Sequence, residues 1–188
     1  PSESPRCVGP KAGLTLPLDV ERNKATELKG ERMAAVIALL RAVNVGGTGK
    51  LPMSELKAMC VAEGYSKAQT YIASGNVVFE TKASPATVKA ALESRLNAYA
   101  GKPVGVVVRT ANEMASVLKS NPFPKAAPNR IIAIFLDEPP APDALDDLRH
   151  RKDEEISLGA REIYVHYGDG MRDSKLVIPA AKLERPEI

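Results

Sequence analysis

The fold is decided by Ala35-Val-Ile-Ala-Leu-Leu-Arg-Ala-Val43, which is followed by Asn44-Val-Gly-Gly-Thr-Gly-Lys-Leu51. The first stretch is almost continuously apolar and has the length of a strand, which is typical of a strand buried on both faces. The glycines of the second stretch must turn the chain, and residues 52–63 then have the spacing of a helix that Gly64 ends. The sequence therefore predicts a strand, a glycine-rich loop and a helix over residues 36–64.

A hairpin, a second helix and a further strand are predicted next. Residues 69–81 contain two β-rich runs on either side of a tight turn. Ser84 is a typical N-cap for a helix that ends at Gly101, and residues 104–109 have the composition of a strand. The resulting order β-α-β-β-α-β predicts a ferredoxin-like subdomain over residues 33–109.

A second, smaller α+β subdomain is predicted over residues 110–188. Thr110 and Glu113 form a capping-box pattern for a helix that continues through Lys119. Strands are predicted over residues 130–136 and 162–167, and helices over residues 141–151 and 174–178. The fold class that follows for the whole chain is α+β.

Composition limits the class of protein and its surroundings. Of the 188 residues, 44% are hydrophobic and 26% are charged, which excludes a chain that is disordered throughout. Residues 1–32 are interrupted by proline and glycine and keep no helical or strand period, so a flexible N-terminal extension is expected there. No stretch has the roughly 20 apolar residues of a spanning helix, and only Cys7 and Cys60 could pair. We therefore expect a cytoplasmic protein with no membrane partner and no disulfide framework.

The glycine-rich loop is the first candidate site. Successive glycines allow the backbone to approach a ligand, and the loop leads into a helix N-terminus, which suits an anion. Asn44 stands where the first glycine of a Walker A loop belongs, and the spacing also differs from a dinucleotide fingerprint. The alternative is a structural turn with a solvated lysine. The candidate ligand residues are Arg41, Asn44, Gly46, Gly47 and Lys50.

The predicted hairpin turn is the second candidate site. Tyr71, Ser74 and Asn76 could offer hydroxyl and amide groups to a ligand. A tight turn needs Ser-Gly-Asn for its backbone alone, and this simpler explanation is the favoured one.

The third candidate site comprises Tyr164, His166, Asp169, Arg172, Ser174 and Lys175. Strand alternation places Glu162, Tyr164 and His166 on one polar face, which could serve acid–base chemistry or could simply face solvent. No spacing of histidines or acids favours a metal site, and no G-x-S-x-G pattern supplies a nucleophile. The sequence thus assigns no catalytic residue, cofactor or oligomeric state, and it leaves open whether the protein is an enzyme.

Several of these segments together resemble a known family. The stretches Ala38–Gly47, Lys50–Met53, Tyr71–Phe79 and Asp173–Leu176 are similar to the bacterial family called domain of unknown function 1697. The resemblance covers about residues 33–182 and implies two α+β subdomains but no activity. The family usually continues beyond the point where this chain stops, which raises the hypothesis that the second subdomain is incomplete. By motif the resemblance also adds Met53 and Gly75 to the positions of interest.

Two functions from different classes follow as hypotheses. The preferred one is a protein that binds a small anionic or phosphorylated ligand in a pocket joining the Asn44–Lys50 loop to residues near Lys175. The alternative is an interaction or nucleic-acid-binding module without chemistry. The net charge of +3 does not require nucleic acid, and the hairpin offers only Phe79 for base stacking, a residue that we expect in the core.

Overall fold

The computed structural model describes residues 33–44 and 50–179. The extension predicted for residues 1–32, the loop glycines Gly46 and Gly47, and the C-terminal residues 180–188 lie outside the described residues.

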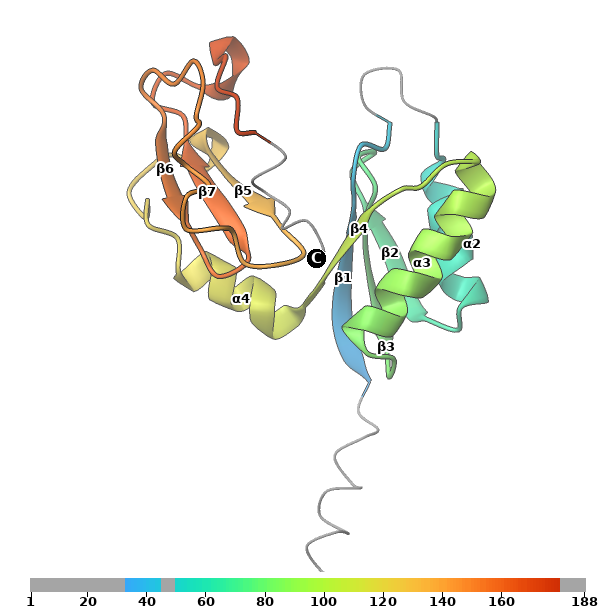
Figure 1. The fold of residues 1–188 in the computed structure, drawn as a ribbon. Helices are drawn as coiled ribbons and strands as arrows, with labels where there is room; N and C mark the ends of the chain where they lie inside the picture. The colour runs from blue at the N-terminus through green and yellow to red at the C-terminus, as the bar shows by residue number, and fades with distance from the viewer. Residues whose placement is uncertain (1–32, 45–49, 180–188) are drawn as a thin grey trace, which may run out of the picture. The chain divides into compact units, whose positions relative to one another are not determined.

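A four-stranded antiparallel sheet forms the first half of the described chain (Figure 1). Its strands are β1 (Ala34–Leu40), β2 (Ser66–Tyr71), β3 (Asn76–Thr81) and β4 (Val106–Thr110), in the order β2-β3-β1-β4. Helices α2 (Met53–Ala62) and α3 (Pro85–Ala100) occupy the predicted places between the strands. The element order is the predicted β-α-β-β-α-β, and the strand order is compatible with a ferredoxin-like arrangement.

The core of this half lies between the sheet and the two helices. Val36, Ala38 and Leu40 of β1 are buried against it, whereas Ile37 and Leu39 on the other face are only half-buried. The prediction that this strand is buried on both faces was therefore wrong, because α2 and α3 cover a single face (Figure 1). The helices contribute Leu56, Cys60, Val88, Leu92 and Leu96, and the strand β3 contributes Val77 and Phe79.

Local signals explain where α3 begins and ends. The Ser84 hydroxyl accepts a hydrogen bond from the Thr87 backbone N–H at 3.1 Å, and Pro85 occupies the first helical position. Gly101 ends the helix in the left-handed region with a φ of 66°. Phe79 stacks on Tyr65 with ring centroids 4.4 Å apart, which confirms Phe79 as a core residue.

The second half contains a three-stranded antiparallel sheet and one helix. Helix α4 (Ala111–Lys119) begins at the predicted capping box of Thr110 and Glu113. Strands β5 (Ile131–Phe135), β6 (Glu155–Leu158) and β7 (Glu162–His166) pair in the order β5-β7-β6. A short 3-10 turn covers Pro128–Arg130 and another covers Met171–Asp173.

Two predicted helices of the second half are wrong. Within residues 141–151 no helix forms, and residues 142–147 make successive turns, with the Ala144 N–H donating to the Ala141 carbonyl at 2.9 Å. Arg149 and Val177 form a β-bridge through two hydrogen bonds of 3.1 and 3.0 Å, so residues 174–178 are extended and not helical. In the described part of the chain, no helix is both long and apolar enough to cross a membrane.

Candidate functional site

The loop after β1 and the β2–β3 hairpin loop meet at one end of the first sheet. The Asn44 amide nitrogen donates to the Leu51 carbonyl at 2.8 Å and to the Ala73 carbonyl at 2.7 Å. The Asn44 side-chain oxygen accepts the Leu51 backbone N–H at 2.8 Å. Asn44 therefore closes the glycine-rich loop at its base and ties it to the hairpin. Both amide hydrogens are used in these contacts, so the donors of this side chain hold the loops and not a ligand.

Gly75 brings the hairpin loop against the end of β1. Its backbone has a φ of 90°, and its carbonyl accepts the Leu40 N–H at 3.1 Å. A Cβ atom at this position would lie 3.0 Å from the Leu40 Cβ and 3.4 Å from the Val43 Cβ. Only glycine satisfies both the backbone conformation and the close approach.

Non-glycine residues in this region adopt the left-handed conformation. Ala42, Asn44 and Ile72 have φ values of 52°, 55° and 53°. Asparagine tolerates this region, but a β-branched residue such as Ile72 is a strong outlier in it. Such strain concentrates at functional loops, where packing and hydrogen bonds impose it.

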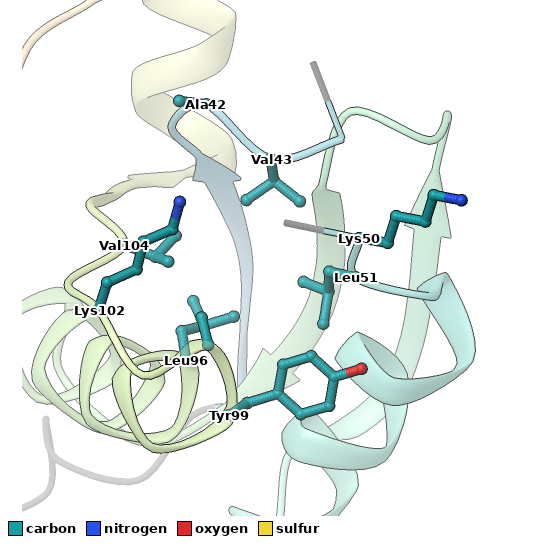
Figure 2. A pocket seen from close by; sticks show the side chains of 9 residues that line it. Ala42, Val43, Lys50, Leu51, Leu96, Tyr99, Lys102 and Val104 are labelled. Atoms are coloured by element: carbon teal, nitrogen blue, oxygen red, sulfur yellow. The ribbon is translucent and has the colours of Figure 1, made fainter. Parts of the chain in front are cut away.

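A pocket of about 240 Å³ adjoins the two described ends of the glycine-rich loop (Figure 2). Val43, Leu51, Leu96 and Val104 supply an apolar floor, and the Tyr99 ring lies at the end of α3 (Figure 2). Lys50 and Lys102 stand on opposite sides of it (Figure 2). The lining residues are Ala42, Val43, Lys50, Leu51, Leu96, Tyr99, Ala100, Lys102 and Val104, and none of these side chains is acidic.

The pocket contains only one of the described residues that the sequence predicted as ligands, namely Lys50. Arg41 lies near Asp137, with nitrogen and carboxylate oxygen 3.5 Å apart. Tyr71 is 69% exposed, and the Asn76 amide donates to the Ser74 hydroxyl at 3.4 Å. Met53, added by motif, packs partly buried against the core.

Tyr99 and Lys102 are pocket residues that the sequence did not reveal. They flank the helix stop at Gly101, about 50 residues after the loop in sequence. Tyr99 follows the buried Leu96 by three residues and so continues the same helix face. This spacing could have predicted that Tyr99 lies on the inner face of the helix, but it does not indicate which distant loop Tyr99 lies beside.

Tyr164 lies apart from this pocket in the core of the second half. Its side chain is buried, and its hydroxyl lies within hydrogen-bond distance of two acceptors that share its one hydrogen, the Val117 carbonyl at 2.8 Å and a Glu162 carboxylate oxygen at 3.0 Å. Burial, with the Glu162 carboxylate beside it, raises the pKa of Tyr164 to about 12. The solvent-facing explanation for this strand face was therefore wrong for Glu162 and Tyr164, since both are buried.

Ser174 and Lys175 lie in the segment after β7 and do not line the pocket that contains Lys50. The Ser174 hydroxyl donates to the buried Glu154 carboxylate and accepts the Leu176 N–H at 3.2 Å. The Ser174 hydroxyl holds the pKa of Glu154 below its usual value. Lys175 is exposed. Ser174 thus fixes the local path of the chain through Glu154.

Metal-binding chemistry finds no support in the described residues. No three of their His, Cys, Asp and Glu side chains come together in a way that could hold an ion. Cys60 is a buried free thiol in α2, and burial raises its pKa to about 11. A neutral, buried thiol is neither a good ligand nor a good nucleophile.

Comparison with known proteins places the chain in a family. A solved structure described as conserved bacterial protein SP0830 from Streptococcus pneumoniae is 25% identical to it, with a TM-score of 0.63. That likeness covers 72% of this chain and 77% of the other chain, and no match is found among curated proteins. Residues 33–164 match the family described as protein of unknown function (DUF1697). The chain therefore belongs to the DUF1697 family.

Proposed function

We propose that the protein binds a small anionic ligand, such as a phosphorylated metabolite with an apolar group, in the pocket beside the glycine-rich loop. The observation that carries this proposal is that Lys50 and Lys102 line opposite sides of an apolar pocket that has no acidic lining residue (Figure 2). An anion gains from both ammonium groups, and the apolar part of the ligand gains from leaving water. A cytoplasmic location, where such metabolites occur, is part of the proposal.

The dipoles of α2 and α3, whose ends lie near the pocket, make its two sides electrostatically different. Lys50 lies shortly before the first turn of α2, where the helix dipole is positive. Lys102 follows the C-terminal end of α3, where the dipole is negative and the lysine offsets it. The anionic group is therefore expected nearer Lys50, with the apolar part of the ligand toward Leu96 and Tyr99.

Thermal unfolding with inorganic phosphate and phenyl phosphate tests the proposal. A ligand at 100 times its Kd adds about 2.7 kcal/mol to the free energy of unfolding. For a chain of this length that corresponds to a rise in Tm of roughly 5–11 °C. Phenyl phosphate should bind more tightly than inorganic phosphate, because burying an apolar ring contributes on the order of 1.5–3 kcal/mol at most.

Matched variants test whether binding depends on the lysines of this pocket or only on the net charge of the protein. The Lys50→Ala/Lys102→Ala double variant should weaken phenyl phosphate binding about tenfold or more. The Lys119→Ala/Lys125→Ala double variant removes the same charge from exposed positions outside the pocket and should bind normally. Equal binding by both double variants, or no shift with a broad panel of phosphorylated metabolites, would contradict the proposal.

A further inference from the structure

A second groove, lined by two arginines, lies between α4 and the turn that precedes β7. Its volume is about 270 Å³. One wall is α4, and the other consists of Ala160 and Arg161 before β7 and of Glu162, the first residue of β7. The lining residues are Arg109, Asn112, Glu113, Ser116, Val117, Ser120, Ala160, Arg161 and Glu162.

Arg109 is a buried cation with only neutral acceptors in direct contact. It lies on β4, and its side chain is 2% exposed. One terminal nitrogen donates to the Val108 carbonyl at 2.9 Å, and the other donates to the Leu136 carbonyl and, at 2.9 Å, to the Arg161 carbonyl. Within the described residues, no carboxylate forms an ion pair with this guanidinium. Burial and the nearby Arg161 charge lower the pKa of Arg109.

An unpaired buried charge is costly unless other charges or a bound ion compensate it. The Phe135 ring gives some compensation, since the Arg109 guanidinium carbon lies 5.6 Å from its centroid. Glu113 and Glu162 also line the groove, but their oxygens are engaged elsewhere.

Both of these carboxylates already accept several hydrogen bonds from neighbouring groups. Glu162 accepts the backbone N–H groups of Ala160 at 3.2 Å and Arg161 at 3.0 Å, together with the Tyr164 hydroxyl. Glu113 accepts the Thr110 N–H at 2.7 Å and hydroxyl at 3.0 Å, and it pairs with the Arg161 side chain. The guanidinium groups of Arg109 and Arg161 each have five N–H donors, which is more than the hydrogen bonds described above use.

The wall formed by α4 adds further polar groups. Asn112 and Ser116 lie at i and i+4 on one face of the helix, and Ser120, the C-cap residue, follows at i+8. Their amide and hydroxyl groups supply donors along the length of the groove. The groove thus combines spare donors with carboxylates whose acceptor oxygens are already used.

We propose that this groove binds a small oxyanion, a carboxylate or a phosphate, through Arg109 and Arg161. The bound oxyanion supplies the negative partner that Arg109 lacks, and Arg161 with the polar face of α4 holds it from the other sides. Planar guanidinium groups suit this role because two parallel N–H donors match two oxyanion oxygens. The site is separate from the lysine pocket and does not depend on the function proposed for it.

Calorimetric titration of the full chain with inorganic phosphate and with acetate tests this site. The measurements use the Lys50→Ala/Lys102→Ala double variant as the background, so that the lysine pocket does not contribute. At least one probe is expected to bind, and the preferred probe indicates whether the natural group is a phosphate or a carboxylate. No binding of either probe at tens of millimolar would overturn the inference.

Two substitutions locate the binding without removing the buried Arg109. Arg161→Gln should weaken binding about tenfold, because it replaces a charged donor with a neutral one. Ser116→Glu places a carboxylate in the groove and should abolish binding while raising Tm. Ala115→Glu adds the same charge on α4 at an exposed position outside the groove and should leave binding unchanged. Binding that survives Arg161→Gln or Ser116→Glu within twofold of the background would overturn the proposed site.

Discussion

Replacement of Asn44 by alanine should destabilise the protein more than its exposed position suggests. Three hydrogen bonds of 2.7–2.8 Å connect the Asn44 amide to Leu51 and Ala73, which belong to two different loops. Alanine removes all three bonds, and it leaves the N–H of the buried Leu51 without its acceptor. The substitution also keeps the φ of 55°, which an alanine adopts reluctantly.

The expected magnitude follows from these contacts. Each net hydrogen bond contributes about 0.5–1.5 kcal/mol, and the left-handed conformation costs a non-glycine residue about 1–2 kcal/mol. Water can replace part of the exposed contact with Ala73, so the expected loss for Asn44→Ala is about 2–4 kcal/mol. Asn44→Gly removes the same bonds but tolerates the backbone conformation, and its loss should be roughly 0.5–1 kcal/mol smaller after the entropy of glycine is counted.

Urea unfolding followed by far-UV circular dichroism measures these differences as changes in midpoint at constant slope. Asn129→Ala is the matched control, because Asn129 is exposed and lies in a short 3-10 turn away from both loops. A loss below about 0.5 kcal/mol for Asn44→Ala, or one equal to that of Asn129→Ala, would refute the assignment of Asn44 as the residue that joins the loops.

Three further outcomes are expected. Gly75→Ala should cost at least about 2 kcal/mol in urea unfolding, because the new Cβ lies 3.0 Å from the Leu40 Cβ at a φ of 90°, whereas Ser74→Ala should be nearly neutral. Tyr164→Phe should cost about 1–2 kcal/mol at neutral pH. Because the folded pKa of Tyr164 is raised from 10.0 to about 12, its stabilisation is complete below pH 10 and is lost as the pH rises to about 12, so Tyr164→Phe should show less of this loss in unfolding measured against pH. Cys60, with its pKa raised to about 11, should react with iodoacetamide far more slowly at pH 8 in the folded than in the unfolded protein, as mapped by mass spectrometry, and equal rates would contradict its burial.

The first half of the fold could be predicted because its signals are local and agree with one another. Helix α3 has a serine cap, a proline at its first position, an apolar face of period four and a glycine stop, and it begins and ends where Ser84 and Gly101 predicted. The hairpin loop was placed less accurately. Tyr71 pairs with Asn76, so residues 72–75 form a four-residue loop in place of the tight turn predicted at Ser-Gly-Asn.

The second half was predicted less well because its segments depend on distant partners. Residues 141–151 do have apolar residues at helical spacing, namely Ala141, Ala144, Leu145 and Leu148, but turns form there and Arg149 pairs with the distant Val177. Strand β6 (Glu155–Leu158) has only four residues and begins after several charged ones, so it lacks a readable period. It becomes a strand because β7 offers it a paired edge.

The difference between local signals and contacts with distant segments also explains which part of the candidate site could be predicted. The motif residues Asn44 and Gly75 are neighbours because the strand order places β3 next to β1, and their contacts hold two strained loops in place. Side chains committed to these contacts cannot also serve a ligand, although the motif identified the right end of the sheet. The groups left for binding are those whose own contacts do not fix the loops, such as Lys50 and Lys102, which follows the end of α3. If this division holds, Asn44→Ala should lower stability and ligand affinity together, whereas Lys102→Ala should lower affinity alone.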